Sequence, residues 1–219
     1  MSLFSGKKVM ITAGPTYEPI DPVRFIGNHS TGKMGFALAR CFAEQGAEVQ
    51  LISGPTALTL EHPLVHVTNV MTADQMFEAC QQHAEQSDIW VFSAAVADYR
   101  PREVAGSKIK KNEDTFTIEL VKSVDIAATL GKQKRADQFT VGFALETNDE
   151  LQNARLKLAK KNLNMVVLNS LKDPGAGFKH DTNKITIVKP EAVETYELKS
   201  KEEVAQDILA SIKAEMACV

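Results

Sequence analysis

The chain has 219 residues, of which 44% are hydrophobic and 24% charged, an ordinary make-up for a globular protein. Its 25 Lys and Arg against 28 Asp and Glu give a net charge of −3, which argues against a broad basic surface, so we expect no nucleic-acid partner. No apolar run reaches the roughly 18 residues of a transmembrane helix, and the first residues lack the apolar stretch of a secretory signal, so we expect no membrane association.

The three cysteines, Cys41, Cys80 and Cys218, lie far apart and have neither zinc-ligand nor redox spacing. We therefore expect reduced thiols and a cytoplasmic location. The five histidines are also scattered, and none pairs at helical metal-binding spacing. A transition-metal site built by the protein alone is not expected.

The first half of the chain alternates predicted strands with predicted helices. Apolar runs predict strands at 9–12, 49–53, 65–70 and 88–96, and helical patterns lie at 33–45 and 72–85. Thr72 and Gln75 form a capping box that opens the second helix. The strand at 88–96 is almost wholly apolar, which is typical of a parallel sheet covered on both faces. This order predicts a Rossmann-like, doubly wound α/β fold with a mostly parallel sheet.

The pattern changes after Tyr99. Residues 108–111 and 115–120 alternate polar and apolar side chains around 112–114, which predicts a half-exposed β-hairpin, an excursion from the sheet. Further strands are predicted at 140–144, 165–168, 184–188 and 195–198, and helices at 125–130, at 149–161 and from a capping box at Ser200 to the C-terminus. No linker or repeat interrupts the pattern, so we expect one domain over residues 1–219.

Ligands of a doubly wound sheet bind at the carboxyl ends of its strands, so the loops at 13–32, 93–111, 121–127 and 142–149 are the candidate sites. Residues 27–33 nearly match a Walker A loop, but Met34 stands where the Mg²⁺-binding hydroxyl belongs. Ser30, Thr31 and Gly32 precede a helix, and their backbone N–H groups are suited to an anion. The alternative is simple N-capping by Ser30 or Thr31.

The strand at 88–96 ends in small residues, which leave room for a flat ligand against the backbone. Asp98 follows, where a carboxylate can bind a hydroxyl or a metal–phosphate, or else cap a helix. Lys108 opens a Lys-Ile-Lys-Lys run whose first and third side chains share a strand face, and Lys157 and Lys161 share a helix face. The residues alone leave open whether these lysines bind a polyphosphate or are only solvated.

The fold class also suits an NAD(P)-dependent reductase. Short-chain reductases need a Tyr four residues before a Lys, and none of the three tyrosines here is followed by one. This counts against the reductase, which we keep as an alternative. A third hypothesis is a non-catalytic nucleotide sensor or dimerisation module.

Five sequence blocks stand in a fixed order at 13–24, 28–35, 94–99, 108–111 and 142–148. They read AGPTYEPIDPVR, NHSTGKMG, AAVADY, KIKK and GFALETN. Together they resemble the phosphopantothenoylcysteine synthetase family, the phosphopantothenate–cysteine ligases of coenzyme A biosynthesis. The resemblance runs from about residue 7 to the terminal helix, and the order of all five blocks makes it specific.

The resemblance implies a ligase that joins 4′-phosphopantothenate to L-cysteine. The first two blocks are of the bacterial kind, which implies CTP with Mg²⁺, an acyl-cytidylate intermediate, and CMP and pyrophosphate as products. It also implies a homodimer with the site near the subunit interface. Many members are fused to a flavin-dependent decarboxylase, for which this chain has no room. We therefore expect neither flavin nor decarboxylation here, and a separate decarboxylase is a candidate partner.

The resemblance also assigns roles to residues. It makes Asn28 and Lys108 catalytic: the amide donates to the acyl carbonyl, and the ammonium offsets the repulsion between a carboxylate and a phosphate. It supports the phosphate of phosphopantothenate as the anion at residues 30–32, and it places Asp98 beside the triphosphate or its metal. The rest of the implied CTP set is Phe92, Ser93, Ala94, Val124, Asp125, Ile126, Ala127, Phe143, Lys157 and Lys161. One departure is Ser123-Val124, where relatives often have Asn-Pro.

Overall fold

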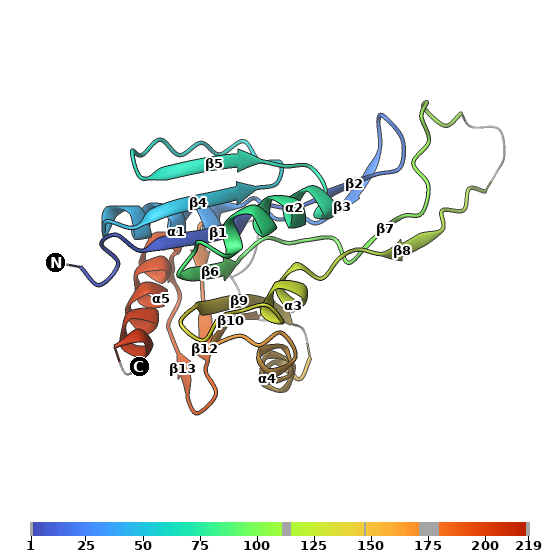
Figure 1. The fold of residues 1–219 in the computed structure, drawn as a ribbon. Coiled ribbons are helices and arrows are strands. Elements are labelled where there is room, and N and C mark those ends of the chain that lie inside the picture. The colour runs from blue at the N-terminus through green and yellow to red at the C-terminus, as the bar shows by residue number, and fades with distance from the viewer. Residues whose placement is uncertain (1, 111–114, 147, 171–179, 218–219) are drawn as a thin grey trace.

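An eight-stranded sheet forms the centre of the computed structural model, which describes residues 2–110, 115–146, 148–170 and 180–217 (Figure 1). Six strands run parallel in the order β10-β9-β6-β1-β4-β5, and β12 and then β13 extend the β10 edge in antiparallel pairing. The mostly parallel sheet is therefore confirmed. The strands are β1 (Lys8–Ala13), β4 (Glu48–Ser53), β5 (Val65–Asn69), β6 (Ile89–Phe92), β9 (Phe139–Glu146), β10 (Met165–Ser170), β12 (Ile185–Val188) and β13 (Val193–Thr195).

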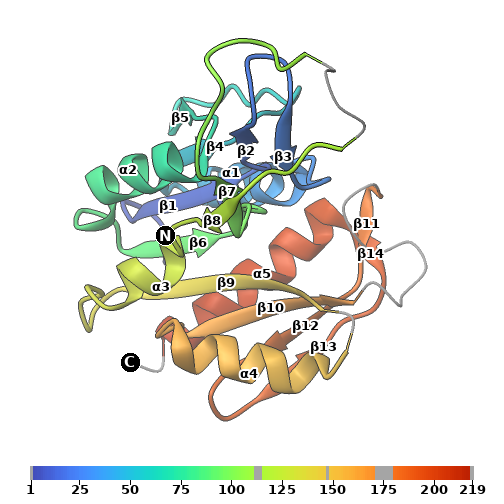
Figure 2. The same cartoon turned by 90° about the vertical axis from the view of Figure 1, so that its right-hand side faces the viewer.

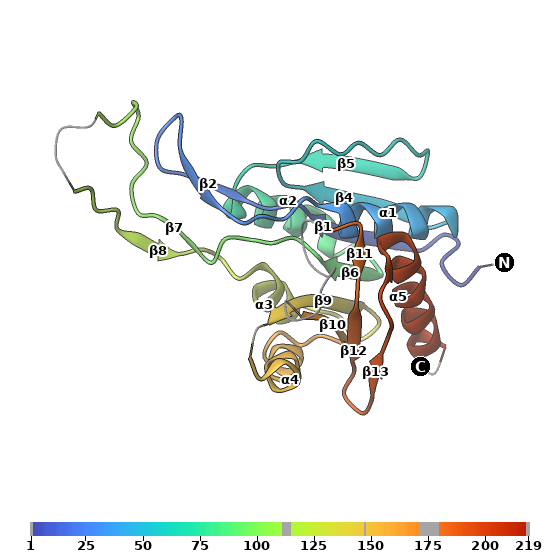
Figure 3. The ribbon, with the colours of Figure 1, turned by 180° about the vertical axis from the view of Figure 1, so that it is seen from behind.

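Helices cover both faces of this sheet (Figure 2). One face carries α1 and α5, which lie side by side (Figure 3). The other carries α2, α3 and α4. The bounds are α1 (Lys33–Glu44), α2 (Ala73–Ala84), α3 (Ile126–Gly131), α4 (Glu150–Lys160) and α5 (Lys201–Met216), so all five predicted helices are confirmed. No helix among the described residues is long and apolar enough to cross a membrane.

The alternation of side chains along β1 explains the apolar run of Val9, Met10 and Ile11 in its middle. Val9 and Ile11 point to the face covered by α1 and α5, whereas Met10 points to the opposite face and packs with Met76 and Trp90. All of these side chains are fully or almost fully buried. Burying one such side chain contributes roughly 1.5–3 kcal/mol, so replacing Val9, Met10 or Ile11 by a polar residue costs stability.

Both cysteines that the structure describes are free and buried. Burial raises the pKa of the Cys41 thiol to about 11, with a further contribution from Glu44, and burial raises that of Cys80 to about 12. A thiol that stays protonated at neutral pH is a poor nucleophile and a poor metal ligand. Cys41 and Cys80 thus lie apart in the core, and Cys218 lies outside the described residues.

Two small antiparallel pairs form an arm that projects beyond the carboxyl ends of the central strands (Figures 1 and 3). We call residues 17–27 together with 99–110 and 115–122 the projecting arm. Its paired strands are β2 (Tyr17–Pro19) with β3 (Phe25–Gly27), and β7 (Tyr99–Pro101) with β8 (Leu120–Lys122).

The predicted hairpin between 108–111 and 115–120 is wrong in its pairing. Residues 108–110 and 115–119 form no strand; the two legs pair instead at 99–101 and 120–122, nearer the sheet. The reason is that hydrogen bonds to a distant segment replace the hairpin pairing. Ala105 donates its N–H to the carbonyl of Ile20, and Ile109 donates its N–H to the carboxylate of Asp21. Lys111 and the predicted turn at 112–114 lie outside the described residues.

Two other boundaries also differ. The strand predicted at 88–96 ends at Phe92, after which the chain leaves the sheet with one isolated bridge from Ala95 to Pro15. The strand predicted at 195–198 lies at 193–195, because Val188 and Thr186 of β12 pair with Val193 and Thr195. A further short pair, β11 (Thr182–Asn183) with β14 (Lys199–Ser200), leads directly into α5.

The start of α1 packs very closely against the end of β1, and two glycines permit it. A Cβ at Gly35 would stand 2.5 Å from the Cβ of Ala13, so only glycine allows this approach. Gly32 adopts φ = 81°, a left-handed conformation that other residues rarely take, and it lies against Gly14. The N-terminus of α1 is thereby held directly above the carboxyl end of β1.

Candidate functional site

A cavity of about 350 Å³ lies at the carboxyl ends of the central parallel strands, where the doubly wound fold predicts a ligand. Its floor is formed by the ends of β1, β6 and β9 and by the loop at 93–98. The N-termini of α1 and α3 open onto it from opposite faces of the sheet. Lys157 of α4 and Lys161, the C-cap of that helix, lie on the α3 side.

Every site residue predicted from the sequence lines this cavity except Asn28 and Lys108. The structure therefore brings together residues from strands β6 and β9, from helices α3 and α4, and from the loops beside them. These are Ser30, Thr31, Gly32, Phe92, Ser93, Ala94, Asp98, Val124, Asp125, Ile126, Ala127, Phe143, Lys157 and Lys161. Their gathering follows from the parallel arrangement, because every βα loop leaves the sheet at the same edge.

Asn28 lies at the rim and holds the loop after β6. Its amide nitrogen donates to the carbonyls of Ala95 at 3.0 Å and Val96 at 3.3 Å. The hydroxyls of Thr12 and Thr16 accept the N–H groups of Ala94 and Ala97 in the same loop, at 3.2 and 2.9 Å. Both of the bonds that the Asn28 amide nitrogen donates thus go to the loop after β6.

The N-terminus of α1 carries no side-chain cap within the described chain. Its N-cap is Gly32, whose N–H donates to the Ser30 hydroxyl at 3.3 Å, and the first turn contains no acidic residue. The alternative of N-capping by Ser30 or Thr31 is therefore wrong. The turn opens onto the cavity with its positive dipole end, which favours an anion there.

The opposite wall is built around the start of α3. Asp125 caps this helix by accepting the Ala128 N–H at 3.1 Å, and Lys161 donates to the same carboxylate oxygen at 2.9 Å. Lys157 donates to the Phe143 carbonyl, and burial, together with the charge of Lys161, lowers its pKa. These two lysines are therefore part of the cavity wall rather than a solvated stripe.

Asp98 is an exposed carboxylate on the cavity wall. Its carbonyl accepts the Ser123 N–H at 2.9 Å, which joins the loop after β6 to the residues before α3. Among the residues that the structure describes, no group of three or more His, Cys, Asp or Glu could hold a metal on its own. One carboxylate suits Mg²⁺, which keeps several waters and is often bound through substrate phosphates.

The cavity wall also contains residues that were not predicted as site residues, and four of them carry an amide or an ammonium group. Lys33 belongs to α1, whereas Asn169, Asn183 and Lys201 come from β10, β11 and α5. The capping box at Ser200 and Glu203 is confirmed and was the available signal for the start of α5. It could not show that the chain returns to the cavity before that helix, because this depends on the antiparallel addition of β12 and β13.

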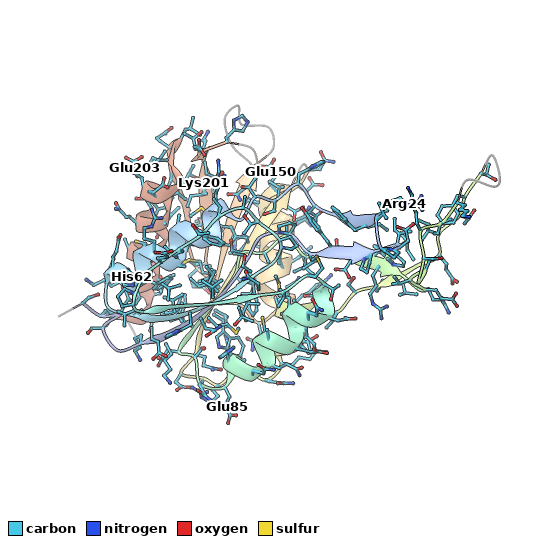
Figure 4. The ribbon with its side chains drawn as sticks, turned by 90° about the horizontal axis from the view of Figure 1, so that it is seen from above. Arg24, His62, Glu85, Glu150, Lys201 and Glu203 are labelled. Carbon is cyan, nitrogen blue, oxygen red and sulfur yellow. The ribbon has the colours of Figure 1, made fainter. Side chains whose placement is uncertain are left out.

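Lys108 stands on the projecting arm and does not line the cavity. The next residue, Ile109, donates its N–H to Asp21 at 3.1 Å, while Arg24 donates to the Ile109 carbonyl at 3.1 Å. Asp21 is buried and also accepts the N–H groups of Val23 and Arg24 at 2.8 and 3.0 Å. In Figure 4, Arg24 lies on the arm that extends from the body of the protein, and Lys201 lies in the body. A single chain thus holds Lys108 apart from the other site residues.

The fold and the cavity define a Rossmann-like α/β protein whose site is built to receive anionic groups. The chain belongs to the family described as DNA/pantothenate metabolism flavoprotein C-terminal domain, whose model matches residues 4–216.

Its relatives include longer proteins. It is 51% identical, over 95% of its length, to a prokaryotic protein named cysteine/cysteine sulfinic acid decarboxylase, and covers 58% of that protein. It is 45% identical to the coenzyme A biosynthesis bifunctional protein CoaBC of Vibrio parahaemolyticus, over 96% of this chain and 53% of that one. The chain thus spans little more than half the length of these relatives.

A solved structure matches over the whole length. The crystal structure of the C-terminal domain of a coenzyme A biosynthesis bifunctional protein CoaBC covers 100% of both chains, with 41% sequence identity and a TM-score of 0.84. At this identity and coverage, the likeness extends to the sequence as well as to the fold.

The Asp21 cluster predicts how the projecting arm is held. In Asp21→Asn, the side chain loses its charge and its ion pair with Arg24, so hydrogen exchange at residues 105–110 should accelerate at pH 7. The guanidinium of Arg24 holds the pKa of Asp21 well below its ordinary range. The protection given by the carboxylate is therefore complete above the ordinary pKa of an aspartate, about 4, and is lost only as pH falls further, through the lowered pKa.

The control for this measurement is Asp137→Asn. Asp137 is an exposed carboxylate paired with Arg135, remote from the arm, and its loss should leave exchange in the arm unchanged. Equal exchange in Asp21→Asn and the parent protein at pH 7 would show that Asp21 does not anchor the arm.

Proposed function

We propose that this chain is the ligase that joins 4′-phosphopantothenate to L-cysteine in coenzyme A biosynthesis. The match to the CoaBC C-terminal domain carries this proposal, since it covers both chains completely at 41% identity. The cavity supports it, because almost all the site residues implied by the family resemblance line this single cavity. Its volume of about 350 Å³ falls in the usual range of ligand pockets, roughly 300–1,000 Å³.

The proposed reaction has two steps. A carboxylate oxygen of phosphopantothenate bonds to the α-phosphorus of CTP, and pyrophosphate leaves. The amine of cysteine then attacks the acyl carbon, CMP leaves, and the amine proton is released. The first step brings two anions together, so fixed positive groups must offset their repulsion. The two helix N-termini and the lysines of the cavity are suited to this task.

We assign CTP to the β6 loop and the α3 wall. Phe92, Ser93 and Ala94 offer a backbone edge for a flat base, and residues 124–127 with Lys157 and Lys161 offer donors to phosphate or ribose oxygens. Phe143 forms part of the same wall. Asp98 is the carboxylate that we assign to the Mg²⁺ accompanying the triphosphate.

We assign the phosphate of phosphopantothenate to residues 30–32. The support is the uncapped N-terminus of α1, with its free dipole end facing the cavity. Asn28 lies between this end and the β6 loop and is placed to donate to an acyl carbonyl held there.

We propose that Lys108 acts when the projecting arm closes over a cavity, either its own or that of a second copy in a homodimer. The support is its place on the arm, whose residues 105–109 are held by only a few hydrogen bonds to 20–24. A cytoplasmic homodimer, with or without an associated decarboxylase, is the assembly that we propose.

Neither reported relative's name denotes a reductase, and no observation favours that alternative. Decarboxylation appears in the name of the 51% identical relative, but this chain spans only 58% of that protein. That activity is therefore not transferred to this chain.

A nucleotide panel tests the proposal. With phosphopantothenate and cysteine present, pyrophosphate release should require CTP, and mass spectrometry should detect the amide product. Without cysteine, the acyl-cytidylate should accumulate. Equal turnover with ATP would make the nucleotide assignment wrong. Tight CTP binding without turnover under any condition would favour the sensor hypothesis.

Asn28→Asp should reduce kcat by roughly 10²–10³ while CTP still binds, because a carboxylate accepts hydrogen bonds but donates none. His29→Ala, on the next exposed residue, is the control and should keep its rate. Steady-state kinetics with a thermal melt separate chemistry from folding. Full activity of Asn28→Asp would remove the catalytic assignment.

Lys108→Gln should slow turnover by a similar factor without lowering the melting temperature, because the side chain is exposed and on the arm. Lys110→Gln is the matched control: it removes an equal charge two residues away, also from an exposed position. Single-turnover rates of the two variants should differ strongly. If the single-turnover rate falls by the same small factor in both variants, Lys108 contributes only to the overall positive charge of the arm.

A further inference from the structure

A buried carboxylate in the first sequence block has no role in the reaction as proposed above. Glu18 lies in the middle of β2, and it is only 1% exposed. Its Oε1 accepts the N–H of Ala73, the first residue of α2, at 2.9 Å. A carboxylate at such a place lowers stability unless hydrogen bonds compensate its burial.

The start of α2 provides this compensation. Thr72 caps the helix by accepting the Gln75 N–H, so its hydroxyl leaves the N–H of Ala73 to another acceptor. The helix dipole is positive at this end and favours a negative charge. Glu18 thus joins β2 to the first turn of α2 by a charged and directional hydrogen bond.

A second bond holds β2 to the segment that leads into α2. The N–H of Tyr17 donates to the carbonyl of Met71 at 2.8 Å. Two successive residues of β2 are therefore tied to this segment, one as donor and the next as acceptor. The hairpin of β2 and β3 leaves the body beside the start of α2 (Figure 1), and it cannot slide along that helix without losing the Glu18 bond.

β2 determines the position of Asn28 through β3. Tyr17 pairs with Gly27, the residue immediately before Asn28. The contact is close, because a Cβ at Gly27 would stand 2.7 Å from Cδ1 of the Tyr17 ring and 2.9 Å from the carbonyl oxygen of Thr16. A displacement of β2 is therefore transmitted to Asn28.

The two ends of this hairpin hold the same loop of the cavity. The hydroxyl of Thr16, just before β2, accepts the N–H of Ala97 at 2.9 Å. The amide nitrogen of Asn28, just after β3, donates to two carbonyls of that loop. The Glu18 bond thus sets the hairpin against α2, and the hairpin sets the Asn28 amide against the cavity rim.

We propose that Glu18 is a positioning residue, which fixes the Asn28 amide at the cavity rim by holding β2 on the first turn of α2. Its effect on catalysis rests on the proposed ligase function, in which that amide donates to the acyl carbonyl. Glu18 does not line the cavity, so it acts through Asn28 rather than on the substrate. The reach of its side chain, rather than its charge, is what this role requires.

Glu18→Asp and Glu18→Gln separate reach from charge. The aspartate keeps the charge on a side chain one methylene shorter, whereas the glutamine keeps the length and an acceptor oxygen without the charge. Steady-state kinetics well below the melting temperature should show kcat lowered roughly 10- to 100-fold in Glu18→Asp, with the KM for CTP unchanged, because the catalytic amide is misplaced. Glu18→Gln should retain most of the kcat of the parent protein.

Thr72→Ala is the matched control for helix stability. It removes another capping acceptor from the same end of α2, so it should lower the melting temperature and leave kcat unchanged. The proposal would be overturned by a parental kcat in Glu18→Asp, by an equal or larger loss in Glu18→Gln, or by the same loss in Thr72→Ala.

The side-chain amide of Asn28 gives a readout that needs no turnover. Its two cross-peaks in ¹H–¹⁵N spectra are identified by their absence from Asn28→Asp, and their positions depend on the bonds to the loop after β6. Glu18→Asp should shift both cross-peaks, and Glu18→Gln and Thr72→Ala should leave them in place. Unshifted cross-peaks in Glu18→Asp would also overturn the positioning role.

These two readouts separate the positioning role from the ligase function. A parent protein that forms no amide product from phosphopantothenate, cysteine and CTP would contradict the ligase. Shifted Asn28 cross-peaks in Glu18→Asp alone among the Glu18 and Thr72 variants would still support the positioning of Asn28 by Glu18.

Discussion

The parallel pairing of β1, β6 and β9 is the constraint on which the site depends. It brings every following loop to one edge of the sheet, and the helices that begin there direct their N–H groups and positive dipole ends to the same edge. The backbone N–H groups and helix dipoles at such an edge favour anions whatever the side chains there are. The close contact of Gly35 with Ala13 strengthens the effect, because it holds the first turn of α1 directly over the end of β1.

The four lysines of the cavity wall are each held by a protein oxygen. Lys157 and Lys201 donate to backbone carbonyls, and Lys33 and Lys161 pair with carboxylates. This arrangement lowers the free energy of gathering four like charges around a small space, since each is satisfied while no ligand is bound. For the phosphates of the proposed reaction, binding exchanges these bonds for stronger ones with a dianion, and the side chains do not have to be ordered first.

The sequence predicts local elements well here and long-range contacts poorly. The strands of the sheet and all five helices follow from apolar periodicity and from the capping boxes at Thr72 and Ser200, because those signals are local. The hairpin pairing was wrong because residues 105–109 bond to residues about 85 positions earlier, which no local pattern reveals. Lys201 was missed for the same reason: its place depends on a chain reversal through β12 and β13.

The projecting arm and the cavity have opposite physical requirements. The cavity needs rigid walls, and it has them in strand ends and buried loops tied by Thr12 and Thr16. The arm contributes little to the core and exposes Val23, Phe25, Tyr99 and Val104. One buried carboxylate, Asp21, joins its two parts. A catalytic cation on such an arm can enter and leave the site at low cost, whereas the same cation built into the wall would bind product as tightly as substrate. Separating Lys108 from the other lysines therefore suits the proposed reaction, in which pyrophosphate leaves before the amine of cysteine attacks.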